Sequence, residues 1–255
     1  MDGTPGQMRV AVVRDGGVPD AVAVEEPLEI RVRGRALAVT MRTPGADEEL
    51  ALGFLHGEGL LLAAAPVGLS DELAGNVVDV DAELVRQPPE RRFYATSSCG
   101  ICGKGALEEV AVLAPPAAAG PVVPRAVLAS LPDRLAREQP GFDQTGGLHA
   151  TGLFTAAGEL LIAREDVGRH NAMDKVIGRA LLDGRLPLAG HVLCVSGRLS
   201  FELVQKAAVA GAPVLVGVSA PTSLAVQLAA DRGMTLCGFA RGGSLNVYSG
   251  AERVG

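Results

Sequence analysis

The first third of the chain alternates apolar with polar residues, which is the pattern of strands that bury one face. This alternation predicts strands at residues 10–13, 28–33 and 37–42, with Gly34-Arg35 as the hairpin turn between the last two. Apolar residues then recur at helical spacing, which predicts a helix over residues 48–62. This part of the chain is therefore expected to form a small unit of strands and at least one helix.

Beyond an uncharged segment rich in Pro and Ala at residues 114–121, short apolar runs alternate with segments of helical length. Strands are predicted at 148–155, 159–164, 191–196, 214–218, 235–239 and 245–248, and helices at 124–138, 171–182, 200–210 and 223–232. Short buried strands separated by helices are typical of an α/β fold, with a layered mixed sheet that is parallel in part. We expect a smaller N-terminal α+β domain at residues 1–120 and an α/β domain at residues 121–255.

Composition narrows the class of protein. In 255 residues, 48% are apolar and 20% charged, which is typical of a globular chain. The net charge of −6 argues against nucleic-acid binding, which usually requires a basic surface. The longest uncharged run, residues 207–230, contains Pro213 and Pro221 and is better explained by a strand and a helix than by a membrane span. No secretory signal is evident, so a cytoplasmic location is expected.

Two cysteines, Cys99 and Cys102, stand among small residues in the run Thr-Ser-Ser-Cys-Gly-Ile-Cys-Gly. Strand-like pieces at 77–85 and 92–95 come before them, and a helix is predicted over 103–113. A Cys-x-x-Cys at a helix start lowers the thiol pKa, which suits redox or sulfur chemistry. Half of a zinc site is the alternative, although it needs two further ligands. The spacing alone leaves both open.

A second observation bears on the zinc alternative. His56-Gly-Glu58 followed by Cys99 and Cys102 reproduces the residue types of the zinc-deaminase signature. However, no Pro precedes Cys99, and the predicted helix is ending at His56. Cys194 and Cys237 lie within apolar runs and are expected in the core. A zinc-dependent deaminase-like hydrolase is therefore the weakest of the readings.

The densest polar segment is residues 164–171, followed by Asp174 and Lys175. Such a cluster is often a solvated loop, but this one follows a strand and precedes a helix, where α/β sheets bind ligands. Arg169, His170 and Lys175 are candidates to hold phosphate, with Asp166 and Asp174 orienting them. His149, after two glycines, is equally compatible with a structural and a functional role.

Three other segments follow apolar strands, at residues 196–198, 219–223 and 239–244. Each is explained by a turn and a helix cap when taken alone. Together their small residues, hydroxyl groups and arginines, among them Arg198, suit a phosphorylated, nucleotide-like ligand. The glycine patterns of the P-loop and of the Rossmann fold are both missing from the sequence.

The motifs, taken in order, resemble one known family. They are Glu-Glu-Pro-Leu-Glu-Ile-Arg-Val at 25–32, Ser-Cys-Gly-Ile-Cys-Gly at 98–103, Thr-Gly-Gly-Leu-His-Ala at 145–150, Glu-Asp-Val-Gly-Arg-His-Asn-Ala at 165–172, Ser-Gly-Arg at 196–198, Ser-Ala-Pro-Thr-Ser-Leu-Ala at 219–225 and Phe-Ala-Arg-Gly at 239–242. The chain resembles the formate dehydrogenase accessory sulfurtransferase family, FdhD, over nearly its whole length.

The resemblance implies a sulfurtransferase. Such a protein accepts persulfide sulfur from a cysteine desulfurase and transfers it to the molybdenum bis-guanine-dinucleotide cofactor, bound as a substrate, before the cofactor enters formate dehydrogenase. The resemblance also implies a deaminase-like C-terminal domain without the deaminase metal, and a homodimer. No permanently bound metal is expected, and the metal of the substrate is molybdenum or tungsten.

The same resemblance implies roles for individual residues. Cys99 would carry the persulfide, with Cys102 as its partner. The cofactor would be contacted by Phe239, Ala240, Arg241, Gly242, Gly243 and Ser244, to which position along the chain adds Arg198, Arg169 and His170. The alternative is a cofactor-binding chaperone that docks on formate dehydrogenase without transferring sulfur.

Overall fold

A computed structural model describes residues 7–10, 20–69, 75–86 and 115–255. Cys99 and Cys102 lie outside the described residues, as do the strand expected at 92–95 and the helix expected at 103–113.

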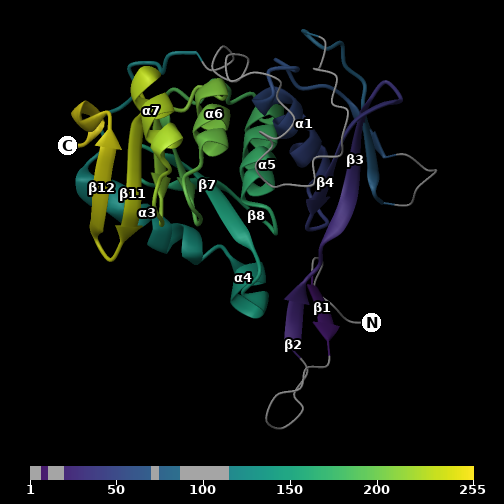
Figure 1. The fold of residues 1–255 in the computed structure, drawn as a ribbon, viewed down its shortest axis with the longest axis horizontal. Coiled ribbons are helices and arrows are strands. Elements are labelled where there is room, and N and C mark those ends of the chain that lie inside the picture. The colour runs from purple at the N-terminus through teal and green to yellow at the C-terminus, as the bar shows by residue number, and fades with distance from the viewer. Residues whose placement is uncertain (1–6, 11–19, 70–74, 87–114) are drawn as a thin grey trace.

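The C-terminal part contains a mixed sheet in the order β12-β11-β10-β9-β7-β8 (Figure 1). The central strands β9, β10 and β11 are parallel, whereas β7, β8 and β12 pair in antiparallel fashion with their neighbours. The strands are β7 (His149–Thr155), β8 (Leu160–Asp166), β9 (His191–Val195), β10 (Val214–Gly217), β11 (Thr235–Arg241) and β12 (Ser244–Ser249). The expected layered sheet with partial parallel pairing is confirmed.

Helices cover this sheet on both faces. On one face lie α5 (Arg169–Leu182), α6 (Phe201–Val209) and α7 (Ser223–Asp231), and on the other lies α3 (Arg125–Ala136). Successive residues of one strand, such as Leu193 and Cys194, belong to opposite cores. Cys194 and Cys237 are both fully buried, as expected, and burial raises the pKa of both thiols.

A second sheet, in the order β4-β3-β6-β5, forms the N-terminal unit. It comprises β3 (Glu26–Val32), β4 (Arg35–Arg42), β5 (Val67–Leu69) and β6 (Val77–Val80), and it packs against α1 (Asp47–Gly57). The hairpin turn lies one residue earlier than expected, because Arg33 and Gly34 adopt the positive φ values of 48° and 77°. The helix is shorter than the expected 48–62, and β6 ends before the expected residue 85.

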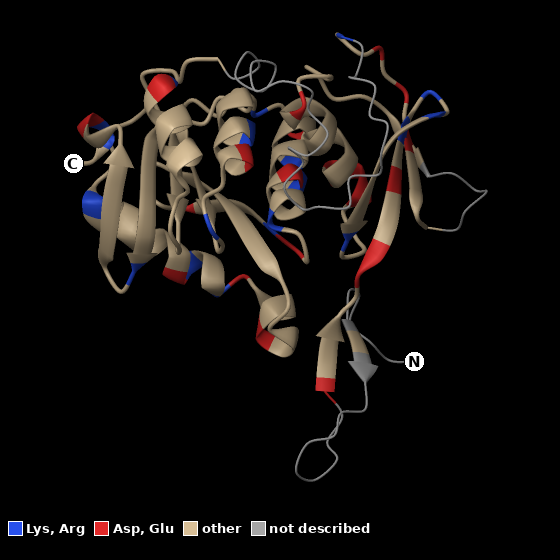
Figure 2. Cartoon of the chain, in the orientation of Figure 1, with Lys and Arg blue, Asp and Glu red and all other residues tan. Residues whose placement is uncertain are grey.

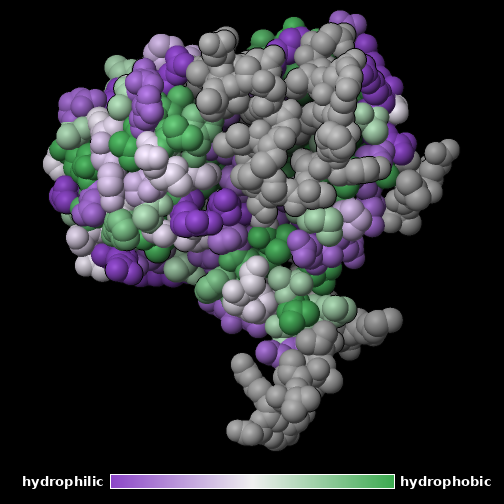
Figure 3. Space-filling model, viewed as in Figure 1, coloured by the Kyte–Doolittle hydropathy of each residue, from purple (hydrophilic) through white to green (hydrophobic). Residues whose placement is uncertain are grey.

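A short antiparallel pair, β1 (Gln7–Val10) and β2 (Asp20–Ala23), extends away from the rest of the molecule (Figure 1). β2 approaches α4 (Pro140–Thr145), which the sequence did not predict. Apolar surface gathers where these two elements meet (Figure 3), and Phe142 of α4 is 44% exposed there. Over the described ranges, no helix has the length and apolar character needed to cross a membrane.

The N-terminal and C-terminal parts are joined by direct packing of α1 on α5. At their crossing Gly53 and Gly178 bring the two backbones together, with almost no room for a side chain. The bidentate ion pair of Arg164 with Glu49, at 2.6 and 2.7 Å, lies beside this crossing. The division of the chain at residue 120 remains a prediction.

Candidate functional site

The three segments that follow the parallel strands lie side by side at one edge of the C-terminal sheet. Parallel strands end at the same edge, so their following loops are neighbours. Backbone hydrogen bonds connect them: the N–H of Phe239 donates to Ser219 O at 3.2 Å, and that of Leu199 to Ala220 O at 3.1 Å. The structure therefore brings together residues 196–198, 219–223 and 239–244, as the strand pattern predicted.

The segment from Phe239 to Ser244 differs from the expected loop. β11 continues to Arg241 and β12 begins at Ser244, so the segment is the end of a hairpin with Gly242 and Gly243 as its turn. These glycines have φ values of 55° and 77°, which suits the tight turns that match strand twist. Ala240 is fully buried, whereas Arg241 and both turn glycines are exposed.

Phe239 is in an unusual backbone conformation. Its φ is +51°, in the left-handed region that non-glycine residues rarely adopt, and the pairing of β11 with β12 is irregular at this point. The side chain remains 39% exposed at the carboxyl edge of the sheet. Strained positions of this kind cluster at ligand sites, and an exposed aromatic ring can stack on a base.

Basic side chains surround Gly197 at the end of β9. An ideal Cβ built on Gly197 would lie 3.4 Å from His149 Nδ1 and 3.6 Å from Arg169 Cδ. Arg198 follows in the chain and is exposed. Figure 2 shows basic positions beside the lower end of α5, where the helix begins at Arg169 and its dipole adds positive potential. This arrangement suits an anion.

The surroundings of the histidine in this group disfavour its protonated form. Desolvation by burial lowers the pKa of His149, and the charges of Arg169 and Arg198 lower it further, while Asp166 acts in the opposite direction. Asp166 is the partner of His149 across the β7–β8 pair. The sequence left the role of His149 open, and its place opposite an acidic residue in a hairpin was the signal that could have located it.

Asp166 acts as a buried structural acceptor and makes no contact with solvent. Its carboxylate accepts hydrogen bonds from the backbone N–H of Thr43 at 3.1 Å and of Gly168 at 2.8 Å. It also pairs with Lys175 Nζ at 2.7 Å and accepts from Asn171 at 3.1 Å. The carboxylate therefore fixes the segment before α5 and ties it to the N-terminal unit.

Lys175 and Asp174 do not reach the site, contrary to the sequence prediction. The Lys175 side chain is 2% exposed in its pair with Asp166, so it cannot receive a phosphate from solvent. Asp174 is equally buried and pairs with Lys206 at 2.9 Å. These two residues belong to the interior face of α5, which the local charge pattern did not indicate.

His170 is 6% exposed. Its Nε2 is 3.1 Å from Ser200 Oγ and 3.6 Å from Glu202 Oε2. Because both oxygens approach the same ring nitrogen, the three groups do not form a catalytic triad, in which the acid contacts the other nitrogen. Ser200 also caps α6, accepting from Leu203 N at 3.4 Å. His170 is thus placed to support the Arg198–Ser200 segment.

His56, the possible zinc ligand, is a buried residue of α1 with 6% exposure. Its Nδ1 donates to Leu61 O at 2.9 Å, and burial lowers its pKa. In the part of the chain that the structure describes, no three His, Cys, Asp or Glu side chains gather as metal ligands would. His56 is therefore accounted for by its packing.

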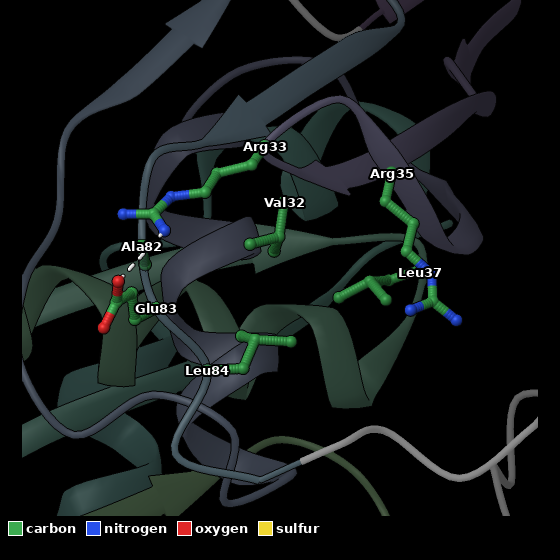
Figure 4. Close-up of a pocket in the computed structure, with 7 residues that line it drawn as sticks. All are labelled: Val32, Arg33, Arg35, Leu37, Ala82, Glu83 and Leu84. Atoms are coloured by element: carbon green, nitrogen blue, oxygen red, sulfur yellow. Dashed lines mark hydrogen bonds and ion pairs between the residues drawn. The ribbon is translucent and has the colours of Figure 1, made fainter.

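A separate pocket of about 330 Å³ lies in the N-terminal unit (Figure 4). Apolar side chains of Val32, Leu37 and Leu84 line it, and Arg33 at its rim pairs with Glu83 at 3.3 Å. It contains none of the residues that the sequence singled out for chemistry.

Comparisons with known proteins place the chain in a family. The model of the FdhD/NarQ family matches residues 23–255. A protein of Streptomyces coelicolor called "Sulfur carrier protein FdhD" is 55% identical, over 96% of this chain and 94% of its own. One of the same name from Mycolicibacterium paratuberculosis is 52% identical, over 93% of each.

A solved structure agrees with these relatives. The crystal structure of a candidate formate dehydrogenase accessory protein from Desulfotalea psychrophila superposes with a TM-score of 0.77. It is 29% identical and covers 97% of this chain and 98% of its own. The protein described here therefore belongs to the FdhD/NarQ family, as the motifs predicted.

Proposed function

We propose that this protein is a sulfur carrier that serves formate dehydrogenase. The relatives that match over more than nine-tenths of the chain are called sulfur carrier proteins. The part of the proposal that concerns the cofactor rests on one observation. A group of exposed arginines lies beside an exposed aromatic residue at the carboxyl ends of the parallel strands. The C-terminal sheet, with an antiparallel hairpin at one end and three parallel strands beside it, supports the deaminase-like fold.

The first chemical step is an exchange between persulfide and thiolate. The thiolate of Cys99 attacks the outer sulfur of a persulfide on a cysteine desulfurase, and the donor cysteine leaves as a thiolate. The S–S bond of the donor breaks as the new S–S bond on Cys99 forms, so no external oxidant or reductant is consumed. Cys99 then carries the sulfur, with Cys102 as its partner. Support for the desulfurase and a homodimer comes from the family resemblance.

The acceptor in this proposal is the molybdenum bis-guanine-dinucleotide cofactor, bound as a substrate. β9 and β11 are two strand spacings apart, about 10 Å, so a guanosine diphosphate group can span from Phe239 to Gly197. Phe239 would stack on the base, and Arg241, Arg169 and Arg198 would hold phosphate oxygens. The cofactor's metal centre supplies the site that receives the sulfur.

Persulfide formation tests the sulfur-transfer step. After incubation with a cysteine desulfurase and cysteine, the protein is expected to gain the mass of one sulfur atom, localised on Cys99 by peptide mass spectrometry. Cys99→Ala will abolish the gain and formate dehydrogenase maturation, while Cys194→Ala, which alters a buried thiol, will keep both. A protein that gains no sulfur but still binds guanine nucleotide would be a cofactor-binding chaperone instead.

The hairpin turn offers a test of cofactor binding. Arg241→Ala is expected to weaken binding of guanosine diphosphate about tenfold or more, because a charge-assisted hydrogen bond contributes about 1.5–3 kcal/mol. Arg137→Ala removes the same charge from an exposed position near the end of α3 and should leave the affinity unchanged. Titration calorimetry measures both. Equal losses in the two variants would show a general charge effect without a site at the hairpin.

A further inference from the structure

The pocket in the N-terminal unit has an apolar centre and charged side chains at its two ends. The side chains of Val32, Leu37 and Leu84 point into the space between Arg33 at one end and Arg35 at the other (Figure 4). Arg35 and Leu37 are two residues apart on β4, so they share one face of the strand. Ligand sites typically combine an apolar lining with a few polar groups at fixed positions, and this pocket has that composition.

Hydrogen bonds hold the walls of the pocket in place. At the hairpin turn between β3 and β4, the backbone N–H of Gly34 donates to Asp79 Oδ2 at 2.8 Å. The facing wall is the segment after β6, which is fixed where the N–H of Val85 donates to Leu60 O at 3.1 Å. Its shape therefore exists before a ligand arrives, and binding costs little reorganisation of the protein.

The two arginines of the pocket differ in their surroundings. Arg33 pairs with Asp81 at 3.0 Å and with Glu83 at 3.3 Å, so its charge is offset. Arg35 is exposed, and no residue in the described ranges forms an ion pair or a hydrogen bond with its side chain. The pocket thus presents one guanidinium group to an anion, while Glu83 repels negative charge from the other end. These charges favour a ligand with a single negative group at the Arg35 end.

We propose that this pocket binds a short aliphatic carboxylate, either as a free acid or as the terminal carboxylate of a peptide that ends in an aliphatic residue. The aliphatic group packs among the three apolar side chains of the centre. Arg35 donates two parallel hydrogen bonds to the carboxylate, because the planar guanidinium group matches the geometry of its two oxygens. The pocket shares no residue with the candidate cofactor site, so this inference is independent of the proposed function.

Titration of the isotope-labelled protein with isocaproate, followed by the NMR signals of the backbone amides, tests the proposal. Isocaproate carries the isobutyl group of a leucine side chain and one carboxylate. The amide signals of Leu37 and Leu84 are expected to shift and to saturate as the acid is added. Isocaproamide has the same shape without the charge and should bind about fivefold more weakly, because an ion pair open to solvent contributes modestly to affinity. High salt should reduce this difference.

Three variants assign the effect to the pocket. Arg35→Gln removes the charge from an exposed position, so the fold should be unchanged while the affinity for isocaproate falls about fivefold. Arg137→Gln removes the same charge from an exposed position near the end of α3 and should bind both probes like wild type. Leu84→Ala removes part of the apolar wall and should weaken the acid and the amide by the same factor.

The peptide N-acetylalanylleucine distinguishes the two sources of the carboxylate. Tighter binding of this peptide than of isocaproate assigns the pocket to a chain terminus, and equal or weaker binding assigns it to a free acid. Shifts that do not saturate with either probe, equal affinities for the acid and the amide, or an Arg35→Gln variant that binds isocaproate like wild type would each overturn the proposal. The persulfide test on Cys99 is unaffected by these results, so the two proposals can fail separately.

Discussion

Gly178→Ala is expected to destabilise this protein by about 3 kcal/mol or more, although alanine is the better helix former by about 1 kcal/mol. An ideal Cβ on Gly178 would lie 1.8 Å from Glu49 O, 2.7 Å from Glu49 C and 2.9 Å from Gly53 N. All three are backbone atoms of α1, and backbone cannot rotate away as a flexible side chain can. The helices would have to separate by more than an ångström.

The crossing is reciprocal, so the same result is expected from the other side. A Cβ on Gly53 would lie 1.8 Å from Asp174 O and 2.9 Å from Gly178 N. Separation of the helices would loosen the N-terminal core, which includes Leu181 of α5 alongside Leu50 and Leu55 of α1. Gly53→Ala should therefore cost a similar amount, and the double variant less than the sum, because one separation relieves both clashes.

Denaturant unfolding monitored by circular dichroism measures the effect, with Gly190→Ala as the matched control. Gly190 is exposed, has no neighbour within 4 Å of its ideal Cβ, and should change stability by less than about 0.5 kcal/mol. Gly178→Ala with stability equal to or above wild type would mean that the two helices do not cross this closely in solution.

The close crossing could not be predicted from the sequence. A glycine within a helical pattern indicates only a local loss of helix propensity, and nothing near residue 53 or 178 says which helix it meets. The strands and helices of the C-terminal sheet were predictable, because buried strands are short continuous apolar runs and the helices between them are amphipathic. The sequence of α5 alone does not show which of its polar residues turn inward, because this depends on their partners in α1 and α6.

The candidate site, too, was predictable from the sequence only in part. Adjacent loops at the carboxyl edge follow from parallel strands, which the alternation of strands and helices predicted. The hairpin at residues 241–244 was missed, although Gly-Gly between two apolar runs is a known signal for a two-residue turn. The roles of Asp166 and Lys175 were not predictable, since their mutual pairing and their contacts with Thr43 require the N-terminal unit to be in place.

The second large change in stability is expected at a buried group of charged side chains between α1, α5 and α6. Lys206 pairs with both carboxylate oxygens of Asp174, at 2.9 and 3.0 Å, and lies 5.6 Å from the ring centre of Phe54. Both side chains of the pair are 2% exposed. Glu58 and Glu202 also act on Lys206, and with Asp174 they raise its pKa despite burial. One ammonium group therefore faces several carboxylates.

Because these carboxylates share a single lysine, the most deeply buried of them has a raised pKa. Desolvation raises the pKa of Asp174 to about 7, although the charge of Lys206 lowers it. The folded protein then holds a proton that the unfolded chain releases above pH 3.8. The stability of the wild-type protein, measured relative to the Asp174→Asn variant, should accordingly fall as pH rises from about 4 to about 7. The fall is at most about 1.4 kcal/mol per pH unit, and above this range the difference becomes constant.

Lys206→Met is expected to cost about 3 kcal/mol or more at pH 8, because it leaves Asp174 buried without its counter-charge. The cost should shrink toward pH 5, where the carboxyl group becomes neutral, and a methionine still packs on Phe54. Adding Asp174→Asn to Lys206→Met should remove most of this pH dependence. Urea unfolding at pH 5 and pH 8 for the single and double variants measures the coupling. A cost of Lys206→Met that is the same at both pH values, and additive with that of Asp174→Asn, would show that the two side chains do not share one buried charge pair.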